Sequence, residues 1–201
     1  MKHLQAAWLL AFAAWAPWAA AGPVEVRVTD AAGRPLPQAV VFLESREARA
    51  ALKPTQGVEI AQAAKQFMPQ VTVVPVGSSV TFPNRDTVRH HVYSFSPTKK
   101  FEIKLDVGTP AAPVVFDQPG IAVLGCNIHD NMAAWVVVVD TPYYAQTGTD
   151  GRVTLPQVPA GTYRLRAWHA ALPPGAPAAD VALRVDAAPA QAAVQLAEAR
   201  P

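Results

Sequence analysis

The amino-acid sequence predicts an all-β protein made of short strands. Twenty prolines and eleven glycines punctuate the chain, and valine-rich stretches of four to eight residues lie between them. Prolines and glycines mark turns, and short apolar runs between turns are typical of strands. No long segment combines helical periodicity with capping residues, so we expect no long helix.

A secretory signal sequence is expected before the first strand, at residues 1–21. It has a positive start at Lys2, an almost unbroken apolar run from Leu4 to Trp15, and a small-residue cleavage site before Gly22. A membrane anchor is the alternative, but the run is too short to span a bilayer and no stop-transfer pattern follows it. We therefore expect a periplasmic protein with no membrane span after removal of the signal.

The first strands follow from hydrophobic alternation. Residues 24–29 alternate apolar and polar with period two, as in a half-buried strand, and residues 39–43 form a second, more buried strand. The charged, alanine-rich segment 44–53 fits either a helical turn or a surface loop.

Further strands are expected along the rest of the chain, separated by turn-forming residues. They are 71–76, 80–82, 90–95, 101–105, 114–116, 121–124, 133–139, 153–155, 163–168, 181–185 and 193–196. Pro75 predicts an edge strand or a bulge, because proline lacks the N–H that a central strand needs. Residues 133–139 are apolar throughout, which is typical of a strand in the middle of a sandwich.

The charge balance argues against two classes of partner. The chain has 17 basic and 15 acidic residues, and without Lys2 of the signal 16 basic residues remain, a net charge of +1. Such a balance gives no electrostatic footprint for nucleic acid, and the sequence has no polybasic run for a membrane surface.

The only cysteine, Cys126, is followed by His129 and Met132 on one short segment. An unpaired thiol in an exported protein is open to oxidation and needs an explanation. Metal ligation is one explanation, and intermolecular pairing and inert burial are the others. Thiolate, imidazole and thioether are soft ligands that select copper, and a His2Cys site with a weak axial Met is the ligand set of a blue-copper centre. The segment supplies three of these four groups.

His90 and His91 are the candidates for the missing imidazole. They begin the expected strand 90–95 and follow a polar loop that contains Asn84 and Asp86. Side chains alternate between the two faces of a strand, so only one of the two histidines points at the loop that carries Cys126.

The stretches Asn84-Arg85-Asp86-Thr87-Val88-Arg89-His90 and Cys126-x2-His129-x2-Met132 resemble the cupredoxin family of blue copper proteins. The likeness is to the amicyanin and plastocyanin type, in particular to exported proteins often labelled methylamine utilization proteins, and it covers roughly residues 57–141. It implies a Greek-key β-sandwich with one type 1 copper site. On this resemblance His90, Cys126 and His129 are the strong equatorial ligands and Met132 is the weak axial ligand.

The resemblance also bears on residues around the ligands. The family usually has an asparagine after the first histidine that ties the two ligand loops together, whereas this chain has His91. The His91 ring makes the same tie or faces solvent; a minor alternative is that it binds copper in an unusual geometry. Asn84 and Asp86 either cap their own turn, the interpretation that we favour, or support the histidine ligand. His169 lies outside the cupredoxin stretch and is expected to be structural or on the surface.

The two ends of the chain resemble parts of one carboxypeptidase-regulatory-like (transthyretin-like) β domain. Residues 26–41 look like its opening, and residues 149–165 look like its close. The resemblance implies a second, small β-sandwich with a structural or partner-docking role.

We expect the first of the following two divisions of the chain and keep the second as its alternative. In the first, residues 23–52 and 145–199 together form the second sandwich, and a cupredoxin domain at 57–141 is inserted into it. Such an insertion is tolerated where the ends of the split domain lie close together. In the second, residues 23–141 form the cupredoxin and residues 142–201 a separate β domain.

The function implied by the resemblance is that of a periplasmic one-electron carrier that is not an enzyme. Its partner would be a redox protein such as a cytochrome c or a periplasmic dehydrogenase. The alternative is a copper storage or delivery protein that uses the same ligands. Enzymatic chemistry at copper needs an open coordination position, and Met132 argues against one. A binding module without metal, in which Cys126 is incidental, is a further possibility.

Overall fold

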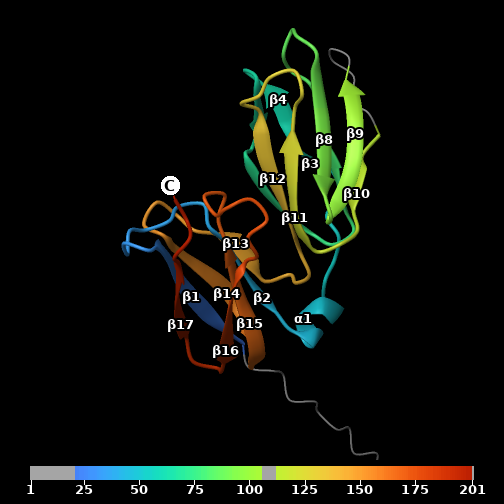
Figure 1. The fold of residues 1–201 in the computed structure, drawn as a ribbon. Helices are drawn as coiled ribbons and strands as arrows, with labels where there is room; N and C mark the ends of the chain where they lie inside the picture. The colour runs from blue at the N-terminus through green and yellow to red at the C-terminus, as the bar shows by residue number, and fades with distance from the viewer. Residues whose placement is uncertain (1–20, 106–111, 201) are drawn as a thin grey trace, which may run out of the picture.

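The computed structural model describes residues 21–105 and 112–200 (Figure 1). The predicted signal sequence lies outside these ranges except for Ala21, with which the first strand begins. Across the described ranges, no helix is long and apolar enough to cross a membrane. The protein is all-β, and the described residues include a single short helix.

The strands between residues 58 and 139 form one β-sandwich. A five-stranded sheet has the order β6-β12-β11-β8-β9, a three-stranded sheet has the order β10-β7-β3, and β4 pairs with β5. The bounds are β3 Val58–Glu59, β4 Ala61–Ala63, β5 Gln66–Met68, β6 Val71–Pro75, β7 Ser78–Thr81, β8 His90–Ser96, β9 Lys99–Leu105, β10 Val114–Phe116, β11 Gly120–Gly125 and β12 Ala133–Val139. Alternate residues of these strands, such as Val92 and Leu124, fill one apolar core.

A second β-sandwich is built from both ends of the chain. Its four-stranded sheet has the order β13-β2-β15-β16 and its three-stranded sheet the order β14-β1-β17. The bounds are β1 Ala21–Asp30, β2 Val40–Glu44, β13 Tyr144–Gln146, β14 Arg152–Pro159, β15 Gly161–Trp168, β16 Ala179–Val185 and β17 Ala190–Leu196. The two N-terminal strands therefore pair with strands of the C-terminal third. The family of this sandwich and the domain boundaries stay predictions.

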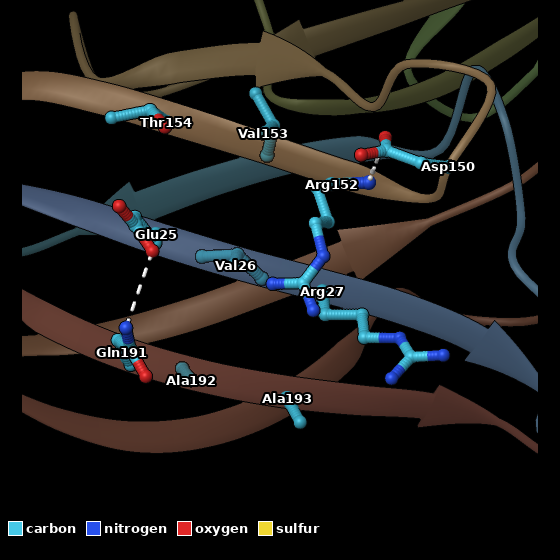
Figure 2. Close-up of a pocket in the computed structure, with 10 residues that line it drawn as sticks. All are labelled: Glu25, Val26, Arg27, Asp150, Arg152, Val153, Thr154, Gln191, Ala192 and Ala193. Carbon is cyan, nitrogen blue, oxygen red and sulfur yellow. Dashed lines mark hydrogen bonds between the residues drawn. The ribbon is translucent and has the colours of Figure 1, made fainter.

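The three-stranded sheet of the second sandwich, β14-β1-β17, has a polar outer face (Figure 2). Glu25 on β1 accepts a hydrogen bond from Nε2 of Gln191 on β17 at 3.3 Å. Arg27 lies opposite Arg152 in the register of β1 and β14. Like charges in opposite positions slightly destabilise a strand pair, so this face adds little to the stability of the sandwich.

The two sandwiches pack against each other through the outer faces of the five-stranded and four-stranded sheets. Val137 of β12, Val40 of β2 and Trp168 of β15 belong to one buried apolar cluster that spans this contact. The indole rings of Trp135 and Trp168 lie 6.2 Å apart. Strand β12 is apolar throughout because one face packs into its own core and the other faces the second sandwich.

The segment 44–53 contains helix α1, Arg46–Ala50, so the helical turn is the correct alternative there. Ser45 caps this helix, because its Oγ accepts the N–H of Ala48 at 3.0 Å. Pro75 ends β6, which is an edge strand of the five-stranded sheet, and this confirms the expected edge position. The short strands β3, β4, β5 and β13 were not predicted.

Candidate metal centre

His90 is the first residue of β8 and points inward. Its side chain lies on the same face of β8 as the core residue Val92, and only 2% of the residue is exposed. The ring atom Nε2 lies 2.7 Å from Oδ2 of Asp86. An ionised carboxylate only accepts hydrogen bonds, so Nε2 donates to Asp86 and Nδ1 is the ring nitrogen left for another partner. The local structure thus fixes the position of this imidazole and the direction in which Nδ1 points.

Asp86 is held in place from a second direction by the β4–β5 hairpin. Its Oδ1 accepts the N–H of Ala64 at 2.7 Å, and its Oδ2 accepts the N–H of Lys65 at 2.9 Å. Both donors lie in the hairpin turn and have positive φ angles, 51° and 56°. The Lys65 N–H lowers the pKa of Asp86 below its usual value, partial burial opposes this, and the bonds from His90 and Ala64 lower it further. Asp86 is therefore an ionised support for His90.

Asn84 caps its own turn, which is the other role that the sequence left open for Asn84 and Asp86. Its Oδ1 accepts the N–H of Asp86 at 3.0 Å, and its Nδ2 donates to the carbonyl oxygen of Val88 at 2.8 Å. These bonds cap the turn. The single interpretation that we favoured for both residues is thus right for Asn84 and wrong for Asp86.

The loop between β11 and β12 carries the other candidate ligands. Cys126 follows β11 and Met132 precedes β12, and both are buried in the core of the first sandwich. The N–H of Met132 donates to the carbonyl oxygen of His129 at 3.0 Å, which closes the loop into a tight turn. His129 itself is only partly buried. The loop therefore places a buried thiol and a buried thioether beneath an imidazole that reaches the surface.

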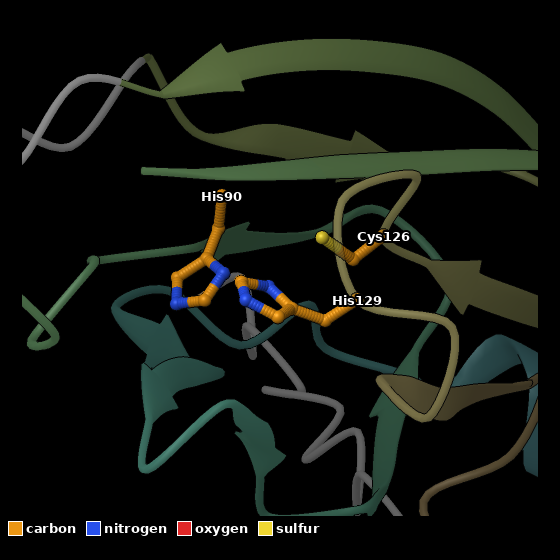
Figure 3. A group of neighbouring side chains, drawn as sticks. All are labelled: His90, Cys126 and His129. Atoms are coloured by element: carbon orange, nitrogen blue, oxygen red, sulfur yellow. The ribbon is translucent and has the colours of Figure 1, made fainter. Parts of the chain in front are cut away.

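His90, Cys126 and His129 converge on one space (Figure 3). One donor atom from each of the three lies within 4.8 Å of the others, and the two imidazole rings are 5.0 Å apart between centroids. The Nδ1 atoms of both histidines are buried and have no hydrogen-bond partner. Buried polar atoms are nearly always paired, so two orphaned nitrogens beside one thiol indicate a ligand. The His2Cys donor set fits a single copper ion.

His91 points to the opposite side of β8, as strand alternation predicts. The solvent-facing alternative is wrong, because the residue is 6% exposed and its ring packs edge-on against Tyr93 at 5.8 Å between centroids. Its Nε2 lies 2.9 Å from Oε1 of Glu102 on β9, although the two groups are not aligned as a hydrogen bond. His91 thus contacts Tyr93 and Glu102 on β8 and β9, on the face of β8 opposite His90.

Tyr93 lies beside the candidate metal centre, and the sequence analysis did not single out this residue. It lies opposite Gly125 in the register of β8 and β11, and a Cβ atom on Gly125 would come within 2.7 Å of its Cζ and Oη atoms. Gly125 directly precedes Cys126, so the missing side chain lets a tyrosine ring cover the backbone beside the thiol. A glycine at a strand end was the only signal for this close approach.

His169 lies in the second sandwich, away from the candidate metal centre. Its Nε2 contacts the carbonyl oxygen of Pro37 at 3.0 Å, and its Nδ1 accepts the N–H of Ala171 at 3.0 Å. Burial lowers the pKa of His169, and the bond to Pro37 partly opposes this. His169 is a structural residue, one of the two roles expected from the sequence.

No protein-family profile and no curated protein match this chain. Among solved structures, a copper-containing nitrite reductase from Thermus scotoductus SA-01 is similar at 28% identity over 44% of this chain, with a TM-score of 0.39. A purple cupredoxin from Nitrosopumilus maritimus has 25% identity, coverage of 41% of this chain and 100% of its own, and a TM-score of 0.37. A variant of amicyanin in its Cu(I) form has 21% identity, coverage of 49% and 98%, and a TM-score of 0.38.

These similarities are limited in extent. The chain spans 23% of the length of the nitrite reductase, and each alignment covers less than half of this chain.

Proposed function

We propose that the protein is a type 1 copper protein that carries single electrons between redox partners. The observation that carries the proposal is the convergence of one buried thiol with two imidazoles whose Nδ1 atoms are buried and unpaired. Bound copper would supply the redox chemistry by cycling between Cu(I) and Cu(II). His90, Cys126 and His129 would hold the ion, with Met132 as the weak fourth ligand. We propose a carrier with no substrate of its own, and not an enzyme.

The residues around the candidate ligands support a rigid site. Asp86 holds the His90 ring and is itself held by two backbone N–H groups of a hairpin. Cys126 and Met132 are packed into the core of the sandwich. Ligands that are locked by packing and hydrogen bonds keep their geometry when the charge at the site changes. This suits electron transfer better than storage or delivery, which require the metal to exchange.

The surface around His129 is where a partner would approach. His129 is the partly exposed member of the donor set, and its neighbour Ile128 is 53% exposed. Exposed apolar side chains beside a functional group are typical of interaction sites. The partner that the family resemblance suggests is a redox protein such as a cytochrome c or a periplasmic dehydrogenase.

A periplasmic location is part of the proposal and depends on the signal sequence. Expression of the full chain in a Gram-negative host, followed by N-terminal sequencing of the periplasmic product, is expected to give a chain that starts at Gly22. A product that keeps residues 1–21 and stays in the membrane fraction would contradict it.

The proposed function is tested by the visible and EPR spectra of the copper-loaded chain from Gly22. The wild type is expected to show a strong blue charge-transfer band and a type 1 EPR signal, and both are expected to disappear in Cys126→Ser and His129→Gln. His169→Gln is the matched control, because it removes a histidine far from the site and is expected to keep the spectrum. A colourless wild type, or a Cys126→Ser variant that stays blue, would refute the type 1 assignment. Rapid loss of copper to a chelator would instead favour storage or delivery.

A further inference from the structure

A crevice lies between the two sandwiches, on the side where their outer sheet faces meet. It is bordered by β11 and β12 of the first sandwich, by β2 and β15 of the second, and by the proline-rich loop 173–178. Its volume is about 610 Å³, which falls within the range of small-molecule sites. Because both sandwiches contribute walls, the crevice exists only when the two sandwiches are folded and packed against each other.

Three aromatic side chains line the crevice. Trp135 of β12 faces Trp168 of β15 with the ring planes inclined at 53°, and Phe42 of β2 lies on the same wall as Trp168. Trp168 and Phe42 are 4% and 6% exposed because their rings pack in the apolar cluster between the two sandwiches, and Trp135 is the partly buried ring of the three. Pre-positioned aromatic surfaces of this kind favour a flat aromatic ligand.

Two polar groups lie beside these rings. The Arg166 guanidinium lies 5.8 Å from the centre of the Phe42 ring and donates to Glu44 and to the carbonyl oxygens of Ala178 and Ala179. These bonds use three of its five N–H groups and leave two available. The Glu44 Oε2 atom accepts from Arg166, whereas Oε1 makes no hydrogen bond within the described part of the chain. The crevice thus offers a free donor and a free acceptor side by side.

The balance of charge narrows the class of ligand. Glu44 pairs with Arg166 at 3.3 Å and with Arg164 at 3.9 Å, and Arg164 also pairs with Asp180. Two cations and two anions balance, so the polar end of the crevice attracts neither an anion nor a cation strongly. A hydroxyl group both donates and accepts, and therefore matches an arginine N–H next to a carboxylate oxygen. We propose that this crevice binds a small neutral aromatic molecule with a ring hydroxyl, that is, a phenol. Val123 of β11 borders the crevice and also the hollow beside Cys126, so such a ligand lies along the strand that leads to the candidate metal centre.

The sequence provides a built-in reporter for this site. Of the five tryptophans, Trp8, Trp15 and Trp18 lie in the predicted signal sequence, so the chain from Gly22 keeps only the two that line the crevice. Tryptophan fluorescence of the copper-free chain therefore reports on the crevice alone. Titration with p-cresol is expected to give a saturable change with a Kd on the order of 0.1 to 1 mM, as suits so small a ligand. Toluene, which lacks only the hydroxyl, is expected to bind at least about tenfold more weakly, because the hydrogen bonds to Arg166 and to Glu44 are both missing.

Two variants separate hydroxyl recognition from simple apolar binding. Glu44→Met removes the acceptor, and Arg166→Gln removes the two free guanidinium donors. Each is expected to weaken p-cresol binding by about tenfold and to leave toluene binding unchanged. Arg152→Gln, on the outer face of the three-stranded sheet (Figure 2), is the matched control and is expected to change neither. Thermal melting of each variant shows whether it is folded before its binding is interpreted.

The proposal has clear contrary outcomes. A fluorescence change that stays linear with p-cresol concentration would mean collisional quenching and no site. Equal affinity for p-cresol and toluene, or an affinity for p-cresol that Glu44→Met and Arg166→Gln both leave unchanged, would overturn the assigned ligand class. The titration uses copper-free protein, so its result is independent of the proposed copper function.

Discussion

Replacement of Asp86 by asparagine is the sharpest test of how the fold prepares the candidate metal centre. The carboxylate makes three contacts: Oδ1 accepts from Ala64, and Oδ2 accepts from Lys65 and lies 2.7 Å from Nε2 of His90. In asparagine one of the two oxygens becomes an NH2 group. Whichever way the amide is turned, this donor faces at least one N–H group, so at least one hydrogen bond is lost. The variant is therefore expected to be less stable than the wild type by about 1–3 kcal/mol.

The same substitution is expected to weaken copper binding. A carboxylate that accepts the ring N–H raises the basicity of the imidazole and fixes its orientation, and loss of such a partner typically costs 10–100-fold in metal affinity. For Asp86→Asn this corresponds to about 1.4–2.7 kcal/mol. The negative charge favours Cu(II) over Cu(I), so the reduction potential is expected to rise. If the affinity for Cu(II) falls tenfold more than the affinity for Cu(I), the reduction potential rises by about 60 mV.

The measurements are a copper competition titration, a redox titration followed at the blue band, and thermal melting of the copper-free protein. Asp130→Asn is the matched control, because it removes an exposed carboxylate from the ligand loop without touching His90. It is expected to leave copper affinity nearly unchanged and to shift the potential far less. An equal shift in both variants would mean that charge alone acts and would refute the role assigned to the Asp86–His90 contact.

The remaining predictions concern the scaffold. Gly151→Ala is expected to cost more stability than Gly33→Ala. Both positions have a positive φ, which strains an alanine by about 1–2 kcal/mol. At Gly151 the new Cβ atom would also come within 2.6 Å of the Val28 carbonyl oxygen. Denaturant unfolding compares the two. Val137→Thr is expected to cost about 1–3 kcal/mol because it buries a hydroxyl between the sandwiches, whereas Val123→Thr, at a 40% exposed position, is expected to stay within about 0.5 kcal/mol. The pKa of His169 is lower in the folded protein than in the unfolded chain, where it is about 6.5. The neutral ring therefore contributes fully to stability above pH 6.5, and this contribution is lost as the pH falls below that value. Acidification is therefore expected to lower the melting temperature of the wild type more than that of His169→Gln, and an equal drop would contradict this.

The parts of the candidate site that the sequence predicts are those determined by local chain geometry. Cys126, His129 and Met132 lie on one short loop, so their spacing alone brings them together. The role of Asp86 depends on Ala64 and Lys65, which are more than twenty residues away and belong to a hairpin that was not predicted. No periodicity in the sequence reports that contact, and this is why the turn-capping interpretation was favoured for Asp86.

His91 shows a second limit of reasoning from alternation. The period of two correctly separates His90 from His91 on opposite faces of β8. It does not show what covers the outer face. Tyr93 on the same strand and Glu102 on the neighbouring strand enclose the His91 ring, so the outward position is buried. The burial of an outward residue depends on tertiary neighbours, and only its direction follows from the strand.

Strand β12 connects the candidate metal centre, the core and the second sandwich. Its inward residues Ala134 and Val136 pack in the core that also holds Cys126 and Met132, and its outward residues contact the second sandwich. A strand that is buried on one face only reads as an alternating pattern, whereas a strand that is buried on both faces reads as a continuous apolar run. The uninterrupted apolar run from 133 to 139 is therefore explained by the second sandwich, which covers the face that would otherwise meet solvent. Because β12 begins directly after Met132, packing of the second sandwich against this strand also helps to fix the end of the ligand loop.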